Sequence, residues 1–153
     1  MRWLILIVIV AFVLGQLMHL KPSARDKELQ AMRQLASRKG LQVRFWTLAA
    51  SGYNRPDIPS SGFMYTLPWP RGFSGFGRWA AWQSAGAGML ALAGKPPAAA
   101  EEWLAAFRGH FPGAWALLES GEAGLSVLWP ERGGNQGIED LAASLQLLQK
   151  TLI

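Results

Sequence analysis

Cysteine is absent from the 153 residues of this chain, and histidine occurs only twice. The lack of thiols excludes disulfides, thiolate metal ligands and a cysteine nucleophile. His19 and His110 are far apart and have no paired spacing, so they do not predict a zinc site. We expect a structural role for both histidines.

Charged residues are also scarce, at 16% of the chain, and no pattern among them is typical of catalysis. The neighbouring acids Glu101/Glu102 and Glu139/Asp140 stand in the first turns of predicted helices, where the helix dipole accounts for them. The glycine-rich residues 72–77, GFSGFG, lack the lysine of a phosphate-binding loop and do not match G-x-S-x-G. We therefore expect no catalytic residues, no cofactor and no metal ion, which makes this a non-enzymatic protein.

A long apolar run is present at the start. Residues 3–20 read WLILIVIVAFVLGQLMHL and carry no formal charge. Eighteen helical residues rise about 27 Å at ~1.5 Å each, close to the ~30 Å hydrocarbon thickness of a bilayer. A cleaved leader would need a small-x-small exit, which fits badly here, and a buried core helix is usually shorter and amphipathic. The sequence predicts an uncleaved transmembrane anchor over residues 1–20, with these anchor residues: Trp3, Leu4, Phe12 and Leu20.

Positive charge is concentrated directly after the apolar run. Residues 21–44 hold seven basic and two acidic side chains, a net charge of +5, whereas the other residues hold eight of each sign. The positive-inside rule then places the following domain in the cytoplasm and the N-terminus outside. A nucleic-acid-binding domain more often spreads its positive charge over its folded surface, so we do not expect nucleic acid as a partner.

A basic amphipathic helix is predicted over residues 21–40. Ser23 is a suitable N-cap, the helix runs to about Arg38, and Gly40 stops it. Its apolar face consists of Leu29, Met32 and Ala36. We expect this face to pack on the domain, or alternatively to dock onto a membrane partner. The residues expected to contact anionic headgroups or a partner are Lys21, Arg25, Lys27, Arg33, Arg38 and Lys39.

Residues 41–153 are predicted to form a small α+β domain. Apolar alternation and turn residues predict four strands, a hairpin and two helices. The strands are expected at 41–49, 63–69, 78–85 and 88–94, the hairpin at 114–129 with its turn near 121–124, and the helices at 96–109 and 138–152. The expected fold is a transmembrane helix followed by a mostly antiparallel sheet with about three helices.

Tryptophan is unusually common, with eight residues against two tyrosines. Residues 69–83, WPRGFSGFGRWAAWQ, interleave aromatic side chains with arginines, as in some single-strand nucleic-acid binders. Trp79 and Trp82 should lie on opposite faces of a strand, so core packing is the simpler interpretation. The alternative is an aromatic surface made of Trp69, Phe73, Phe76, Trp79 and Trp82.

The layout of residues 14–40, LGQLMHLKPSARDKELQAMRQLASRKG, resembles the start of YajC-type proteins, the small single-pass accessory subunit of the bacterial Sec translocase. The resemblance covers about residues 3–45. Beyond it, this chain is longer and Trp-rich, and it is more similar to single-pass inner-membrane proteins of gammaproteobacteria that sometimes carry the YajC label. The resemblance implies a bacterial inner-membrane protein, and it carries over no functional residue.

Together these features favour a single-pass, membrane-anchored interaction protein, with association to an inner-membrane complex such as the translocase as one form. The expected partners are a bilayer with anionic headgroups and a membrane protein. The alternative is a membrane-tethered module that binds a lipid or small molecule in a Trp-lined apolar pocket.

Overall fold

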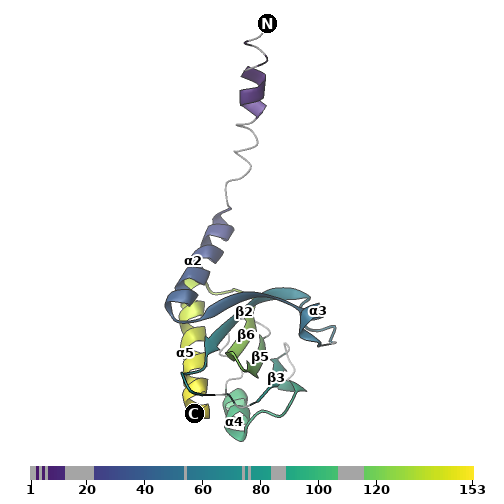
Figure 1. The fold of residues 1–153 in the computed structure, drawn as a ribbon, viewed down its shortest axis with the longest axis vertical. Helices are drawn as coiled ribbons and strands as arrows, with labels where there is room; N and C mark the ends of the chain where they lie inside the picture. Colours follow the sequence, from purple (N-terminus) through teal and green to yellow (C-terminus); the bar gives the residue numbers. More distant parts are fainter. Residues whose placement is uncertain are drawn as a thin grey trace.

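The computed structural model describes residues 3, 5, 7–12, 23–53, 55–73, 75, 77–83, 89–106 and 116–153. Its centre is a six-stranded sheet in which every neighbouring pair is antiparallel, in the order β1-β2-β6-β5-β3-β4. The strands are β1 Gln42–Thr47, β2 Ser61–Pro68, β3 Trp79–Gln83, β4 Met89–Ala93, β5 Ala116–Gly121 and β6 Gly124–Trp129. The predicted antiparallel sheet and α+β architecture are confirmed (Figure 1).

The helices that flank this sheet are α2 Ala24–Arg38, α3 Leu48–Ser51, α4 Ala98–Ala106 and α5 Gly134–Leu152. Helix α2 begins as predicted, because Ser23 and Asp26 form a reciprocal capping box that satisfies backbone donors of the first turn. Helix α5 starts at Gly134, four residues before the predicted start. Residues 48–51 form the short helix α3, where the sequence predicted the end of a strand.

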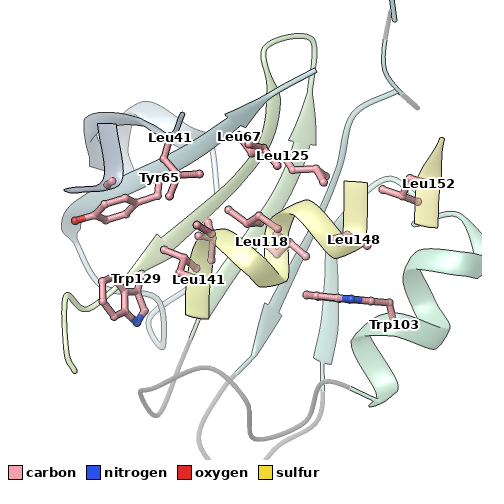
Figure 2. Close-up of a cluster of buried hydrophobic side chains, with 14 of the residues drawn as sticks. Leu41, Tyr65, Leu67, Trp103, Leu118, Leu125, Trp129, Leu141, Leu148 and Leu152 are labelled. Atoms are coloured by element: carbon pink, nitrogen blue, oxygen red, sulfur yellow. The ribbon is translucent and has the colours of Figure 1, made fainter. Parts of the chain in front are cut away.

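The main core lies between one face of the sheet and helices α2, α4 and α5 (Figure 2). Helix α2 contributes Met32 and Ala36, both fully buried. Helix α5 contributes its predicted leucine stripe, which is buried along its length: Leu141, Leu145, Leu148 and Leu152. Since the apolar spacing of i, i+3, i+4 places these side chains on one face, burial of that face holds each helix on the sheet.

A second, smaller core covers the opposite face of the sheet. Its buried side chains include Trp46, Met64, Trp82 and Leu128. Ile58 from the segment after α3 packs among them, and the Trp82 indole donates to the Asp57 carboxylate at 3.0 Å. The sheet is therefore covered on both faces over part of its area.

The predicted transmembrane helix is corrected by the structure. No helix built from the described residues combines the length and the apolar character that a membrane crossing requires. Of the predicted anchor over residues 1–20, residues 1, 2, 4, 6 and 13–20 lie outside the described residues.

Candidate functional site

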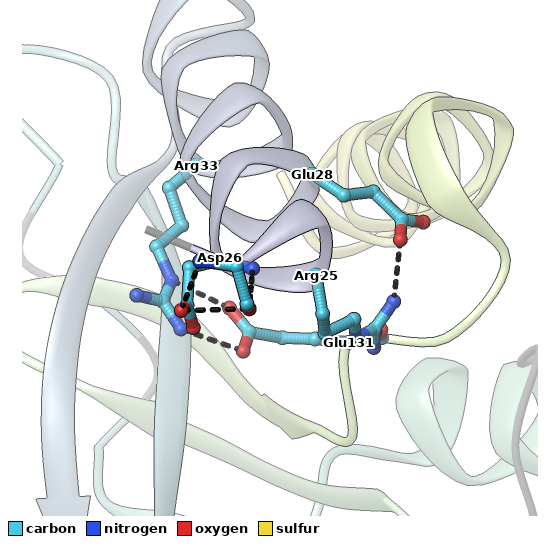
Figure 3. Close-up of polar contacts among 6 residues, drawn as sticks. Arg25, Asp26, Glu28, Arg33 and Glu131 are labelled. Carbon is cyan, nitrogen blue, oxygen red and sulfur yellow. Dashed lines mark hydrogen bonds and ion pairs between the residues drawn. The ribbon is translucent and has the colours of Figure 1, made fainter. Parts of the chain in front are cut away.

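Two of the basic residues predicted to face headgroups or a partner form contacts within the domain, although Arg25 stays half exposed. Arg33 donates from Nε and Nη2 to the two carboxylate oxygens of Glu131, at 2.7 and 2.8 Å. Arg25 donates to the Glu131 backbone carbonyl at 2.9 Å and pairs with Glu28 at 3.0 Å. Figure 3 shows these contacts joining α2 to the segment between β6 and α5.

Glu131 is the centre of this network. Its side chain is only 10% exposed, and it also accepts a 2.6 Å hydrogen bond from the buried Tyr65 hydroxyl. The pKa of Tyr65 is raised well above its usual value, mainly by burial of the hydroxyl and to a smaller extent by the Glu131 carboxylate. The Arg33 guanidinium also lies 3.6 Å from the centre of the Phe63 ring. We interpret this network as a structural link between α2 and the sheet, because the charges of Arg33 and Glu131 neutralise one another.

The other predicted basic residues differ in their surroundings. Lys39 pairs with Glu139 at 3.3 Å. Lys27 and Arg38 are exposed, and within the described part of the chain neither forms an ion pair. Lys21 lies outside the described residues. Lys27 and Arg38 thus differ from the half-exposed Arg25, which is ion-paired, in facing solvent without a described ion pair.

The predicted anchor residues that the structure describes are highly exposed. Trp3 is 79% exposed and Phe12 is 68% exposed. Leu4 and Leu20 lie outside the described residues. The described apolar side chains near this end of the chain therefore do not gain burial from the domain.

The predicted aromatic surface is wrong for its three tryptophans. Trp79 and Trp82 are each 1% exposed and Trp69 is 9% exposed. Trp79 belongs to the main core and Trp82 to the second core, as their three-residue spacing predicted. Phe73 is partly buried with its ring centre 5.1 Å from that of Trp69. Phe76 lies outside the described residues. Both faces of the sheet are covered here, so both sides of the strand are core.

A polar cluster that the sequence did not predict lies on the second face of the sheet. Glu119 of β5 accepts from Arg44 of β1 at 3.0 Å and from the Tyr53 hydroxyl at 3.3 Å. Arg44 reaches it by lying over Met64, with its Nη2 3.1 Å from the Met64 sulfur. The pKa of Tyr53 is raised, mainly by burial and to a smaller extent by the Glu119 carboxylate, and the nearby Arg78 guanidinium opposes this rise. We call Arg44, Tyr53, Arg78 and Glu119 the polar cluster.

Two hollows meet at this cluster. The larger, about 560 Å³, lies between the cluster and the β5–β6 turn at Gly121–Gly124. The smaller, about 270 Å³, is lined by Arg44–Thr47 of β1, by Ala50 and Ser51, and again by Arg78 and Glu119. Arg44, Arg78 and Glu119 line both hollows. A ligand in either hollow would meet two guanidinium groups beside a carboxylate.

This arrangement is suited to recognition of polar groups. Guanidinium groups bind carboxylates and phosphates with directional hydrogen bonds. In the described part of the chain, no group of three or more His, Asp or Glu side chains is placed to hold a metal ion. The polar cluster could not be predicted from the sequence, because its four residues lie at distant positions in the chain. The one available signal was Glu119, a charge inside the apolar strand ALLES.

Comparisons with known proteins do not assign this chain to a family. No protein-family model, no curated protein and no solved structure matches this chain. The resemblance of residues 3–45 to YajC-type proteins therefore stays a prediction.

Proposed function

We propose that this protein is a non-enzymatic interaction protein that attaches to an anionic lipid surface and binds a partner protein there. The observation that carries the proposal is the exposure of the apolar residues near the N-terminus. Following the YajC resemblance, the expected membrane is the bacterial inner membrane. The proposal requires contact of these residues with lipid, and it does not require a helix that crosses the bilayer.

The exposed apolar side chains are numerous for a single short segment. They are between 47% and 79% exposed, and comprise Trp3, Ile5, Ile7, Val8, Ile9, Val10 and Phe12. Fully burying one such side chain contributes roughly 1.5–3 kcal/mol, so leaving all of them in water is costly. A lipid interface offers an apolar environment, and tryptophan is enriched at such interfaces.

Cationic residues supply a second contribution to lipid binding. Lys27 and Arg38 face solvent on α2, and residues 21–44 carry a net charge of +5. Each lysine or arginine near an anionic surface contributes about 1 kcal/mol. We expect apolar and electrostatic terms to act together, because the exposed apolar residues and the basic helix are close in sequence.

Of the described tryptophans, Trp46 lines the smaller hollow, but it shares this hollow with the charged side chains of Arg44, Arg78 and Glu119, so the hollow is not the Trp-lined apolar pocket of the alternative function. Trp69, Trp79, Trp82, Trp103 and Trp129 are each at most 9% exposed and belong to the main or second core. We therefore do not retain a lipid- or small-molecule-binding pocket as a second proposal.

Vesicle flotation tests the attachment. The full chain is mixed with vesicles of phosphatidylcholine, with or without phosphatidylglycerol, and the floated fraction is measured. We expect flotation to be strongest with phosphatidylglycerol and to weaken as salt is added. Replacing both Lys27 and Arg38 with glutamate should remove this lipid preference.

An apolar-segment variant and a matched control make the test specific. The double variant Val8→Asp with Phe12→Asp should abolish flotation. The control is Leu147→Asp, because Leu147 is similarly exposed, at 55%, but belongs to α5. Flotation of the double variant at the level of the unaltered chain would refute attachment through this segment.

A further inference from the structure

Strand β1 forms one edge of the sheet, and its outward backbone groups can be identified. The pairing runs from Gln42 opposite Thr66 to Thr47 opposite Ser61. One step further, the Leu48 amide donates to the Ser60 carbonyl at 2.9 Å, which marks a hydrogen-bonded pair. Antiparallel pairs alternate between hydrogen-bonded and non-hydrogen-bonded.

It follows that Gln42, Arg44 and Trp46 direct their backbone N–H and C=O groups toward β2. Val43, Phe45 and Thr47 direct theirs away from the sheet. Thr47 is also the N-cap of α3, so its carbonyl accepts the first hydrogen bond of that helix. Within the described part of the chain, the outward backbone groups of Val43 and Phe45 and the Thr47 amide have no backbone partner. An edge with unpaired backbone groups is a template for another strand.

Side chains on the two faces of this edge offer different chemistry. On the α2 side, Phe45 is 63% exposed, and its ring packs edge-on against Phe63 with centres 5.5 Å apart. On the other side lies the smaller hollow of the polar cluster, lined by Arg44 and Trp46 of β1 itself and by Arg78. A strand added here would present alternate side chains to Phe45 and to the hollow.

Charge decides which strand fits. Arg44 and Arg78 face one carboxylate, Glu119, in the smaller hollow, which leaves a net charge of +1 there. Opposite charges across neighbouring strands stabilise pairing, and like charges oppose it.

We propose that the outer edge of β1 binds an extended segment of an acidic partner protein, which adds to the sheet as a further strand. The segment places acidic side chains toward Arg44 and Arg78 and apolar side chains on Phe45. A second copy of this chain fits less well, because β1 has no acidic side chain to place toward Arg44 and Arg78. The inference rests on the proposed role as an interaction protein and names the class of partner.

Selection from a displayed library of random peptides tests the proposal, using the full chain in mild detergent without vesicles. We expect enrichment of peptides in which acidic and apolar residues alternate. A synthetic peptide of alternating glutamate and valine should bind, and its lysine–valine counterpart should not. Methylating the glutamate-valine peptide's backbone nitrogens at every second residue should abolish binding in only one of the two registers, because only one set of N–H groups faces β1.

Variants of the chain separate the contribution of backbone hydrogen bonds to peptide affinity from the contribution of side chains. Phe45→Pro removes an outward N–H without breaking the ladder to β2, so we expect a folded protein whose affinity for the acidic peptide falls about tenfold or more. Arg78→Glu should weaken binding of the acidic peptide, because it replaces a guanidinium group of the smaller hollow with a second carboxylate. Leu147→Lys is the control and should leave binding unchanged.

Several results would overturn the inference. These are the absence of any enriched alternating peptide, equal binding by the folded Phe45→Pro variant, or a sedimentation-detected dimer that this variant converts to monomer. The last result would assign the edge to a second copy. Normal flotation with no peptide binding overturns only this inference, whereas peptide binding without flotation overturns only lipid attachment.

Discussion

Replacing Glu131 tests whether the network under α2 holds this helix on the domain. In Glu131→Ala, the Tyr65 hydroxyl loses its acceptor, and Arg33 loses both carboxylate oxygens. Tyr65 is fully buried, so water does not readily replace the lost acceptor. The Arg33 side chain is 29% exposed and can be partly rehydrated.

The magnitude follows from these two losses. An unsatisfied buried hydroxyl costs about 1–3 kcal/mol, and a partly exposed ion pair contributes up to about 1 kcal/mol. We expect Glu131→Ala to lower the free energy of unfolding by about 3 kcal/mol. Tyr65→Phe removes only the donor and leaves the ion pair intact, so it should cost about 1 kcal/mol.

The backbone at Glu131 sharpens the prediction. Its φ is 53°, in the left-handed region that costs a non-glycine residue about 1–2 kcal/mol. Glu131→Gly should therefore be more stable than Glu131→Ala by about 1 kcal/mol, although glycine is usually the more destabilising replacement.

Urea unfolding followed by tryptophan fluorescence measures all four proteins and the double variant Glu131→Ala with Tyr65→Phe. The double variant should lose less stability than the sum of the single changes, because no hydroxyl is left without an acceptor. Additive losses would refute the role of Tyr65. An alanine variant at least as stable as the glycine variant would refute the role of the backbone.

Three further predictions concern stability. Leu148→Ala removes a fully buried side chain and should lower the free energy of unfolding by about 2–5 kcal/mol, measured by thermal or urea unfolding. The control Leu147→Ala, at a neighbouring exposed position, should change it by less than about 0.5 kcal/mol. Equal losses would contradict the assigned buried face of α5. Gly124→Ala should strongly destabilise the protein, because the φ of Gly124 is 150° and a Cβ there would overlap the backbone of β2. Gly121→Ala should be tolerated, because a Cβ at Gly121 meets open space. A stable Gly124→Ala protein would contradict the turn geometry. The raised pKa of Tyr65 means that the unfolded chain loses this proton first, so stability should fall as pH rises above about 10, and the fall should be smaller in Tyr65→Phe.

Local sequence patterns predicted the elements whose determinants are close together in the chain. The N-cap Ser23 and the spacing of Met32 and Ala36 lie within one helix, and the structure confirms both. The β5–β6 hairpin was predicted for the same reason, because Gly121 and Gly124 flank a two-residue turn. Such features depend on neighbours three or four residues away.

Features that depend on distant residues were not predictable in this way. Arg44 and Glu119 are 75 positions apart, and no spacing rule connects them. Arg33 had the pattern of a solvent-facing cation, but its partner Glu131 lies 98 positions later. The tryptophans of β3 were considered for a surface because a strand usually has one exposed face, whereas this strand is covered on both faces.

The direction of the Arg44 side chain links the polar cluster to the free edge of the sheet. Edge strands are commonly protected from unwanted pairing by a charged side chain at the edge. Arg44 is the only charged residue of β1, yet its guanidinium lies over Met64 and pairs with Glu119, toward the middle of the sheet. The most exposed apolar side chain of the strand, Phe45, is left at the edge. Because Glu119 holds the one charge that could guard β1 away from the edge, the same contact that organises the hollow also leaves the strand open to pairing.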